Sequence, residues 1–356
     1  MRRLWVFAVL ALSALAADDG QNVILATRRA GRVEVFDAGT LQPLGTIGVD
    51  LLAESITSSP DGHTLFIAQA MRSIRNSCCA LFALNLESRE MCFLREPAMK
   101  ATFSPDGQKL FFQRGAVGID VFDARTFSRL PTIKAPGNYA LHPSPDGRWV
   151  MGTTNWKGPA VDIFDLAAGA MVQHIEVPNQ SPSGAWAGSR FLLYDGHQGT
   201  LWALTPENTS LGPLLKVTIP EIPGNCQPQN LAVGGGHLFF YELFGGKLDR
   251  RDDCGTKAPG GVFEVEGSTG AVLSHLAPSL HFGRLAVSAD GEFLYGISIS
   301  DGWTGIRLVE IERKTGKVVA EQRLEDDVWN IATARIPAGL VPRGYVIPAA
   351  CSKPLQ

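Results

Sequence analysis

Short apolar runs that end in a polar residue and a turn recur along the chain. Seven copies are present: Val35-Phe36-Asp37, Ala83-Leu84-Asn85, Val121-Phe122-Asp123, Ile163-Phe164-Asp165, Ala203-Leu204-Thr205, Glu264-Val265-Glu266 and Glu310-Ile311-Glu312. Their terminal residues lie 38 to 61 positions apart, and about 46 on average. This period is near the ~40–45 residues of a four-stranded propeller blade. The pattern therefore predicts seven repeated structural units.

A second pattern, a turn of the type Ser-x-Asp-Gly, separates the first two apolar runs in four of the units. The copies are Ser59-Pro60-Asp61-Gly62, Ser104-Pro105-Asp106-Gly107, Ser144-Pro145-Asp146-Gly147 and Ser288-Ala289-Asp290-Gly291. Asp-Gly provides the positive φ that a tight hairpin turn requires. Residues 187–190 and 234–237 are weaker versions. Each turn predicts a hairpin between the first and second strands of a unit.

Each unit contains four runs of β-branched and aromatic residues bounded by turn formers, which is the signature of strands. In the third unit the runs are 101–103, 109–112, 118–122 and 130–133. No segment has a convincing helical period. We expect an all-β fold, a seven-bladed β-propeller with four-stranded antiparallel blades.

The repeats do not begin in phase with the chain. Residues 22–49 provide only three strands, over 23–26, 32–36 and 44–49. The missing inner strand is expected at 329–334, after the seventh unit. The N- and C-terminal strands would then overlap in one blade, which removes the exposed edges of an open array. The propeller is expected over residues 22–336, followed by a C-terminal tail over 337–356.

The first sixteen residues have the features of a secretory signal peptide. Arg2 and Arg3 precede an apolar run over 4–12, and Ala14-Leu15-Ala16 forms a cleavage site of small residues. We expect cleavage and a periplasmic or extracellular protein, with an uncleaved membrane anchor as the alternative. No later run is long enough to span a bilayer, so no membrane span is expected after cleavage.

The charge of the chain argues against two classes of partner. The net charge is −3, and it becomes −5 when residues 1–16 leave with two arginines. A negative protein is poorly suited to nucleic acid or to an anionic lipid surface.

The six cysteines form an even set, which suggests disulfides in an exported chain. Cys226 and Cys254 lie in two long loops of the sixth unit, so a bridge between them is expected. Cys78 and Cys79 either pair with each other, or one of them pairs with Cys92. Cys351 would then pair with the remaining cysteine and fix the C-terminus.

Three features of the repeats are shared with a known family. They are the turns, the Leu-Phe or Leu-Tyr strands that follow them (65–66, 110–111 and 294–295), and the Val-Phe-Asp-Ala-x-Thr phrase at 35–40 and 121–126. In these features the chain resembles the YVTN-type β-propeller repeat family, which is similar to WD-repeat propellers. The resemblance covers residues 22–336, although the YVTN tetrapeptide and the Gly-His and Trp-Asp pairs of WD repeats are absent. It implies a propeller. Members include lactonase-like enzymes, heavy subunits of amine dehydrogenases, and surface or periplasmic binding proteins.

Loops before the first strand and between the second and third strands of each blade should share one face of the ring. The candidate ligand-binding residues on this face are Arg28, Glu54, Arg72, Arg114, Asn138, Tyr139, His197, Asn230, His281, Trp303 and Trp329. Arginines in several blades favour a small anionic ligand or an acidic patch on a protein partner. The alternative is an ordinary solvated loop surface.

Enzyme motifs are mostly missing, since the chain lacks G-x-S-x-G, H-E-x-x-H, a phosphate loop and G-x-G-x-x-G. His197 and His281 are the one credible pair for acid–base chemistry, and we assign no catalytic residue, cofactor or metal ligand. The leading hypothesis is an exported, non-catalytic scaffold that binds a ligand or protein through one loop face. The alternatives are the propeller subunit of an amine-dehydrogenase-like oxidoreductase and a lactonase-like hydrolase.

Overall fold

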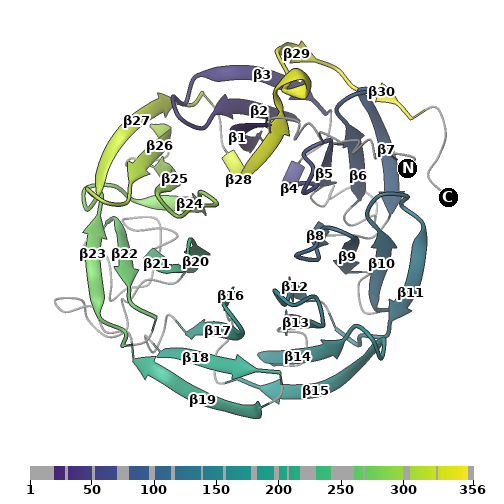
Figure 1. Ribbon diagram of the computed structural model, residues 1–356. Helices are drawn as coiled ribbons and strands as arrows, with labels where there is room; N and C mark the ends of the chain where they lie inside the picture. The colour runs from purple at the N-terminus through teal and green to yellow at the C-terminus, as the bar shows by residue number, and fades with distance from the viewer. Residues whose placement is uncertain are drawn as a thin grey trace, which may run out of the picture.

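The protein folds as a ring of seven antiparallel sheets, as Figure 1 shows for the computed structural model. The structure describes residues 20–28, 31–49, 53–69, 80–95, 101–113, 117–137, 139–154, 158–177, 183–195, 200–206, 208–216, 230–241, 260–267, 269–299, 305–325 and 328–351. The seven-bladed propeller with four-stranded antiparallel blades that the sequence predicts is confirmed.

Four strands build each blade, from the centre of the ring to its rim. The inner strands of blades 1 to 7 are β28 (Val328–Pro337), β4 (Ala53–Ser58), β8 (Ala101–Phe103), β12 (Ala140–Pro143), β16 (Ser183–Ala187), β20 (Asn230–Gly234) and β24 (Phe282–Val287). The second strands are β1 (Gly20–Arg28), β5 (Thr64–Gln69), β9 (Lys109–Gln113), β13 (Trp149–Thr154), β17 (Arg190–Asp195), β21 (His237–Tyr241) and β25 (Phe293–Ile299). The third strands are β2 (Arg32–Asp37), β6 (Leu81–Asn85), β10 (Ile119–Asp123), β14 (Ala160–Asp165), β18 (Thr200–Thr205), β22 (Val262–Val265) and β26 (Ile306–Glu312). The outer strands are β3 (Pro43–Gly48), β7 (Glu90–Arg95), β11 (Arg129–Ile133), β15 (Ala170–Glu176), β19 (Asn208–Lys216), β23 (Val272–Leu276) and β27 (Lys317–Arg323).

Blade 1 is made from both ends of the chain. β28 pairs antiparallel with β1 along its length, with Val23 opposite Ala334 and Ala26 opposite Ile331. The predicted closure by overlapping terminal strands is therefore confirmed, and Trp329 lies at the register shift where β28 begins. Closure leaves no unpaired inner strand at the junction of the two ends.

The C-terminal segment lies across the outer edges of blades 1 and 2 (Figure 1). After the short 3-10 helix η5 (Ala338–Leu340), β29 (Gly344–Val346) adds in parallel to β3, and β30 (Ala349–Ala350) adds in parallel to β7. A disulfide joins Cys92 of β7 to Cys351, with 4.8 Å between their Cα atoms. This bridge confirms that Cys351 fixes the C-terminus and shows that pairing of Cys92 with Cys78 or Cys79 is wrong.

The buried apolar side chains of the described residues form seven clusters, one between each pair of neighbouring blades. Both faces of a blade are thus buried, in the way that repeat units bury their faces against each other. The cluster between blades 7 and 1 contains Ile24 and Phe36 from one blade and Tyr295 and Leu308 from the other. In the part of the chain that the structure describes, no helix has the length and apolar character needed to cross a membrane.

The Ser-x-Asp-Gly turns have one repeated geometry. In blade 4 the Ser144 hydroxyl donates to Asp146 at 2.5 Å and accepts the Trp149 N–H at 2.9 Å, while Gly147 has φ = 70°. The hydrogen bond from Ser144 is the main cause that lowers the pKa of Asp146. Each turn therefore closes the hairpin between an inner and a second strand through side-chain contacts as well as its glycine.

Candidate functional site

A cleft of about 290 Å³ lies beside the outer half of blade 4. Its lining comes from the connection that leaves blade 3 (Pro136 and Gly137), from the loop between β13 and β14 (Gly158 and Pro159), and from strands β14 and β15. The volume is at the lower end of the range for small-molecule sites. Because the two loops precede an inner strand and join second and third strands, the cleft belongs to the loop face predicted to bind ligands.

A buried carboxylate joins two side chains in this cleft. Asp162 of β14 is 2% exposed, accepts a hydrogen bond from the Tyr139 hydroxyl at 2.5 Å, and lies 2.5 Å from Nδ1 of His174 on β15. His174 is half-exposed. Because a carboxylate accepts, His174 donates through Nδ1, and the second ring nitrogen, Nε2, is left for a ligand. The arrangement fixes the ring orientation of an accessible histidine from behind.

The local sequence explains how Tyr139 reaches Asp162. Gly152 of β13 has no side chain, and a Cβ there would lie 2.7 Å from Cδ1 of Tyr139 and 2.9 Å from Cε2 of Phe164. The two rings therefore pack edge-to-face over the strand at 5.4 Å. Gln113 of blade 3 donates to the carbonyl of Gly137 at 2.6 Å and positions the connection just before Tyr139.

The described residues that line the cleft carry a negative formal charge. Burial raises the pKa of Tyr139, and the hydrogen bond and charge of Asp162 raise it further, so the phenol remains a proton donor. Among the lining residues that the structure describes, Asp162 and Glu176 are the carboxylates, and none is a Lys or Arg. These described residues carry a formal charge of −2 when histidine is counted as neutral.

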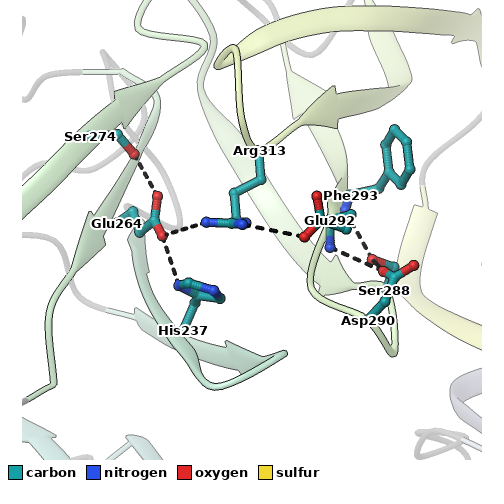
Figure 2. Close-up of polar contacts among 8 residues, drawn as sticks. All are labelled: His237, Glu264, Ser274, Ser288, Asp290, Glu292, Phe293 and Arg313. Carbon is teal, nitrogen blue, oxygen red and sulfur yellow. Dashed lines mark hydrogen bonds and ion pairs between the residues drawn. The ribbon is translucent and has the colours of Figure 1, made fainter.

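A second polar cluster lies between blades 6 and 7, at the opposite face, where the hairpin turns are (Figure 2). Glu264 is 4% exposed and is 2.8 Å from Nδ1 of His237. It also accepts hydrogen bonds from Ser274 at 2.8 Å and from Arg313 at 3.1 Å, and Arg313 reaches Glu292 at 3.3 Å. The buried charge is thus surrounded by donors, and the cluster connects the two blades.

Glu310 occupies the same position in blade 7 but in a different environment. Both glutamates come two residues before the polar end of the repeated apolar phrase. Glu310 is 3% exposed, among the apolar side chains between blades 7 and 1. Burial is the main cause that raises its pKa to about 6, and the charge of Asp37 across the interface adds to the rise.

The described candidate residues from the sequence are divided between several places. Arg28 is 1% exposed and its guanidinium faces Glu34 at 3.5 Å, so this arginine is buried behind the loop face. Glu54 lies at a register shift near the start of β4, and Asn230 begins β20. His281 lies just before β24, and Nδ1 of its ring is buried without a hydrogen-bond partner among the described residues.

Of the predicted residues, the structure brings Tyr139 into the cleft, where its hydroxyl contacts the third strand of its own blade. The predictions that fall outside the described residues are Arg72, Arg114, Asn138, His197, Trp303, Cys78, Cys79, Cys226, Cys254, the signal segment 1–16 and the side chain of Trp329. Sequence reasoning missed Asp162 and His174. The available signal was an aspartate inside an otherwise apolar strand, Val161-Asp162-Ile163-Phe164.

In the part of the chain that the structure describes, no group of three or more His, Cys, Asp or Glu side chains is placed to hold a metal ion.

The sequence matches no protein-family model and no curated protein. Three solved structures with a similar fold are the dihydro-heme d1 dehydrogenase NirN in complex with DHE, a candidate 6-phosphogluconolactonase from Bacteroides fragilis, and apo AztD from Citrobacter koseri. Their identities to this chain are 12%, 13% and 13%, and their TM-scores are 0.57, 0.60 and 0.56. The matches cover 92%, 90% and 89% of this chain and 78%, 99% and 98% of the other chains. At these identities the likeness shows the propeller fold, and the YVTN-type resemblance stays a prediction.

Proposed function

We propose that this protein is an exported, non-catalytic β-propeller that binds a ligand in the cleft beside blade 4. One observation carries the proposal, namely that the half-exposed His174 is held by the buried Asp162, which Tyr139 also contacts. A side chain fixed from behind in this way needs little ordering when a ligand arrives, which favours binding. The disulfide to Cys351 supports export to an oxidising compartment.

The same orientation of a histidine by a carboxylate is used in enzymes, where the second ring nitrogen takes a proton from a nucleophile. Among the described residues, His174 contacts Asp162, and Thr154 is the one hydroxyl in the cleft lining besides Tyr139. Thr154 is buried. We therefore favour ligand binding over catalysis in this cleft. The anionic ligand that the sequence predicts concerns the arginine-bearing loops and stays a prediction about those loops.

The experiment compares binding with turnover on the same purified protein. A panel of anionic, cationic and neutral small metabolites is screened by thermal shift, because a ligand that binds the folded state raises Tm. δ-Gluconolactone hydrolysis and dye-linked oxidation of primary amines are measured in parallel. We expect a member of the panel to raise Tm, no turnover above the buffer rate, and loss of the Tm shift in His174→Trp, which fills the cleft. Turnover of either substrate, or a Tm shift that survives His174→Trp, would contradict the proposal.

A further inference from the structure

The chemistry of the cleft lining indicates which class of ligand fits, and this inference rests on the proposed function. His174 and Glu176 lie two residues apart on β15, and both line the cleft. A period of two places both side chains on one face of the strand, with their Cα atoms roughly 6–7 Å apart. One offers an imidazole nitrogen and the other a carboxylate, and both groups accept hydrogen bonds when His174 is neutral.

The charge and the apolar walls of the cleft indicate the chemical class of the ligand. The negative charge of the described lining residues disfavours an anion, and one of the two carboxylates, Asp162, lies behind His174 in a water-poor position, where its field is weakly screened. Pro136, Pro159 and Met171 provide apolar walls on which a short hydrocarbon chain can lie. Acceptors at one end and apolar walls beside them match an organic cation with a short stem.

We propose that the cleft binds a cationic nitrogen group, a guanidinium or an alkylammonium, held between Glu176 and Nε2 of His174. The group donates one N–H to the carboxylate of Glu176 and another to Nε2 of His174, so both acceptors receive a hydrogen bond. The source is a free small molecule or the arginine or lysine side chain of a bound segment, since both present the same chemistry.

The test is isothermal titration with methylguanidinium and with its neutral isostere methylurea. We expect methylguanidinium to bind and methylurea and methyl phosphate to give no heat. Glu176→Gln should weaken binding about tenfold or more, because the cation then meets a neutral amide instead of a carboxylate, and hydrogen bonds to charged groups are the stronger ones. Glu321→Gln, an exposed glutamate on the outer strand of blade 7, is the matched control and should change nothing.

His174→Lys tests the charge preference of the cleft most strictly. Asp162 can pair with the introduced ammonium, so the fold is retained, while the positive charge of that ammonium repels the methylguanidinium probe. Binding of methylguanidinium should be lost although Tm is retained. A capped Ala-Arg-Ala peptide separates the two sources: tighter binding than methylguanidinium indicates a polypeptide segment, and weaker binding indicates a free molecule.

Three results would overturn the inference. The first is that methylurea binds as tightly as methylguanidinium. The second is that Glu176→Gln and Glu321→Gln have equal effects on binding. The third is that methylguanidinium does not bind up to about 50 mM, which corresponds to a binding free energy weaker than about 2 kcal/mol. Binding of methyl phosphate that His174→Trp removes would refute the cationic class and leave the ligand-binding function standing.

Discussion

Replacing Glu310 with glutamine should stabilise the protein at neutral pH. The pKa of this glutamate rises from 4.5 to about 6 in the folded protein, mainly because the side chain is buried. Between these two values the folded state binds more protons than the unfolded state, so stability falls as pH rises through this window. Above about pH 7 the carboxylate is ionised in both states and its full cost is present.

The size of the effect follows from the shift. One pKa unit corresponds to 1.36 kcal/mol, so a rise of about 1.5 units corresponds to about 2 kcal/mol. Glutamine has nearly the same shape and does not titrate. Glu310→Gln should therefore gain about 2 kcal/mol in the free energy of unfolding at pH 8 relative to its effect at pH 4, where the wild-type side chain is protonated.

Urea unfolding of both proteins at pH 4, 6 and 8 measures this difference, and subtracting the two proteins cancels the other titrating groups. The matched control is Glu264→Gln in the preceding blade. That buried glutamate contacts His237, Ser274 and Arg313, so replacing its charge leaves three part-buried donors poorly paired and should cost about 3 kcal/mol. If Glu310→Gln destabilises at pH 8, or if its effect is the same at all three pH values, the assignment of a costly buried charge is wrong.

Three more substitutions test the attachment of the C-terminal segment, the packing of Tyr139 in the cleft and one hairpin turn. Cys351→Ser removes the disulfide to Cys92, so it should lower the free energy of unfolding by about 2–5 kcal/mol and expose the C-terminal segment to protease. An unchanged digestion pattern would show that the disulfide does not hold this segment in place. Gly152→Ala should cost about 1–3 kcal/mol by displacing the ring of Tyr139, and it should also weaken ligand binding, whereas Gly339→Ala, with no atom within 4 Å, should do neither. Ser144→Ala should cost about 1 kcal/mol in urea unfolding, and no loss would mean that the glycine alone closes the turn.

The fold followed from the sequence because its signals are local. Asp-Gly turns such as Asp146-Gly147 determine hairpins within a few residues, and the missing first strand at residues 22–49 indicated that the C-terminal strand completes blade 1. Strand pairing then followed from order alone. The structure confirms the number of blades, the four strands in each and the closure by β28.

The site was harder to predict because it depends on tertiary contacts. A blade is buried on both faces, so an aspartate in a strand such as Asp162 needs a partner that alternation of polar and apolar residues does not identify. Tyr139 was placed at the loop face, but its contact with the third strand depends on the missing side chain of Gly152. The pairing of Cys92 with Cys351 depends on the path of the tail across two blades.

A crystal structure of the protein with bound methylguanidinium would show directly whether Glu176 and His174 hold the cation. We expect the cation beside blade 4, with one N–H directed to the carboxylate of Glu176 and another to Nε2 of His174, and with Asp162 still hydrogen-bonded to Tyr139. An empty cleft in crystals that hold the cation at another place on the ring would refute this binding mode.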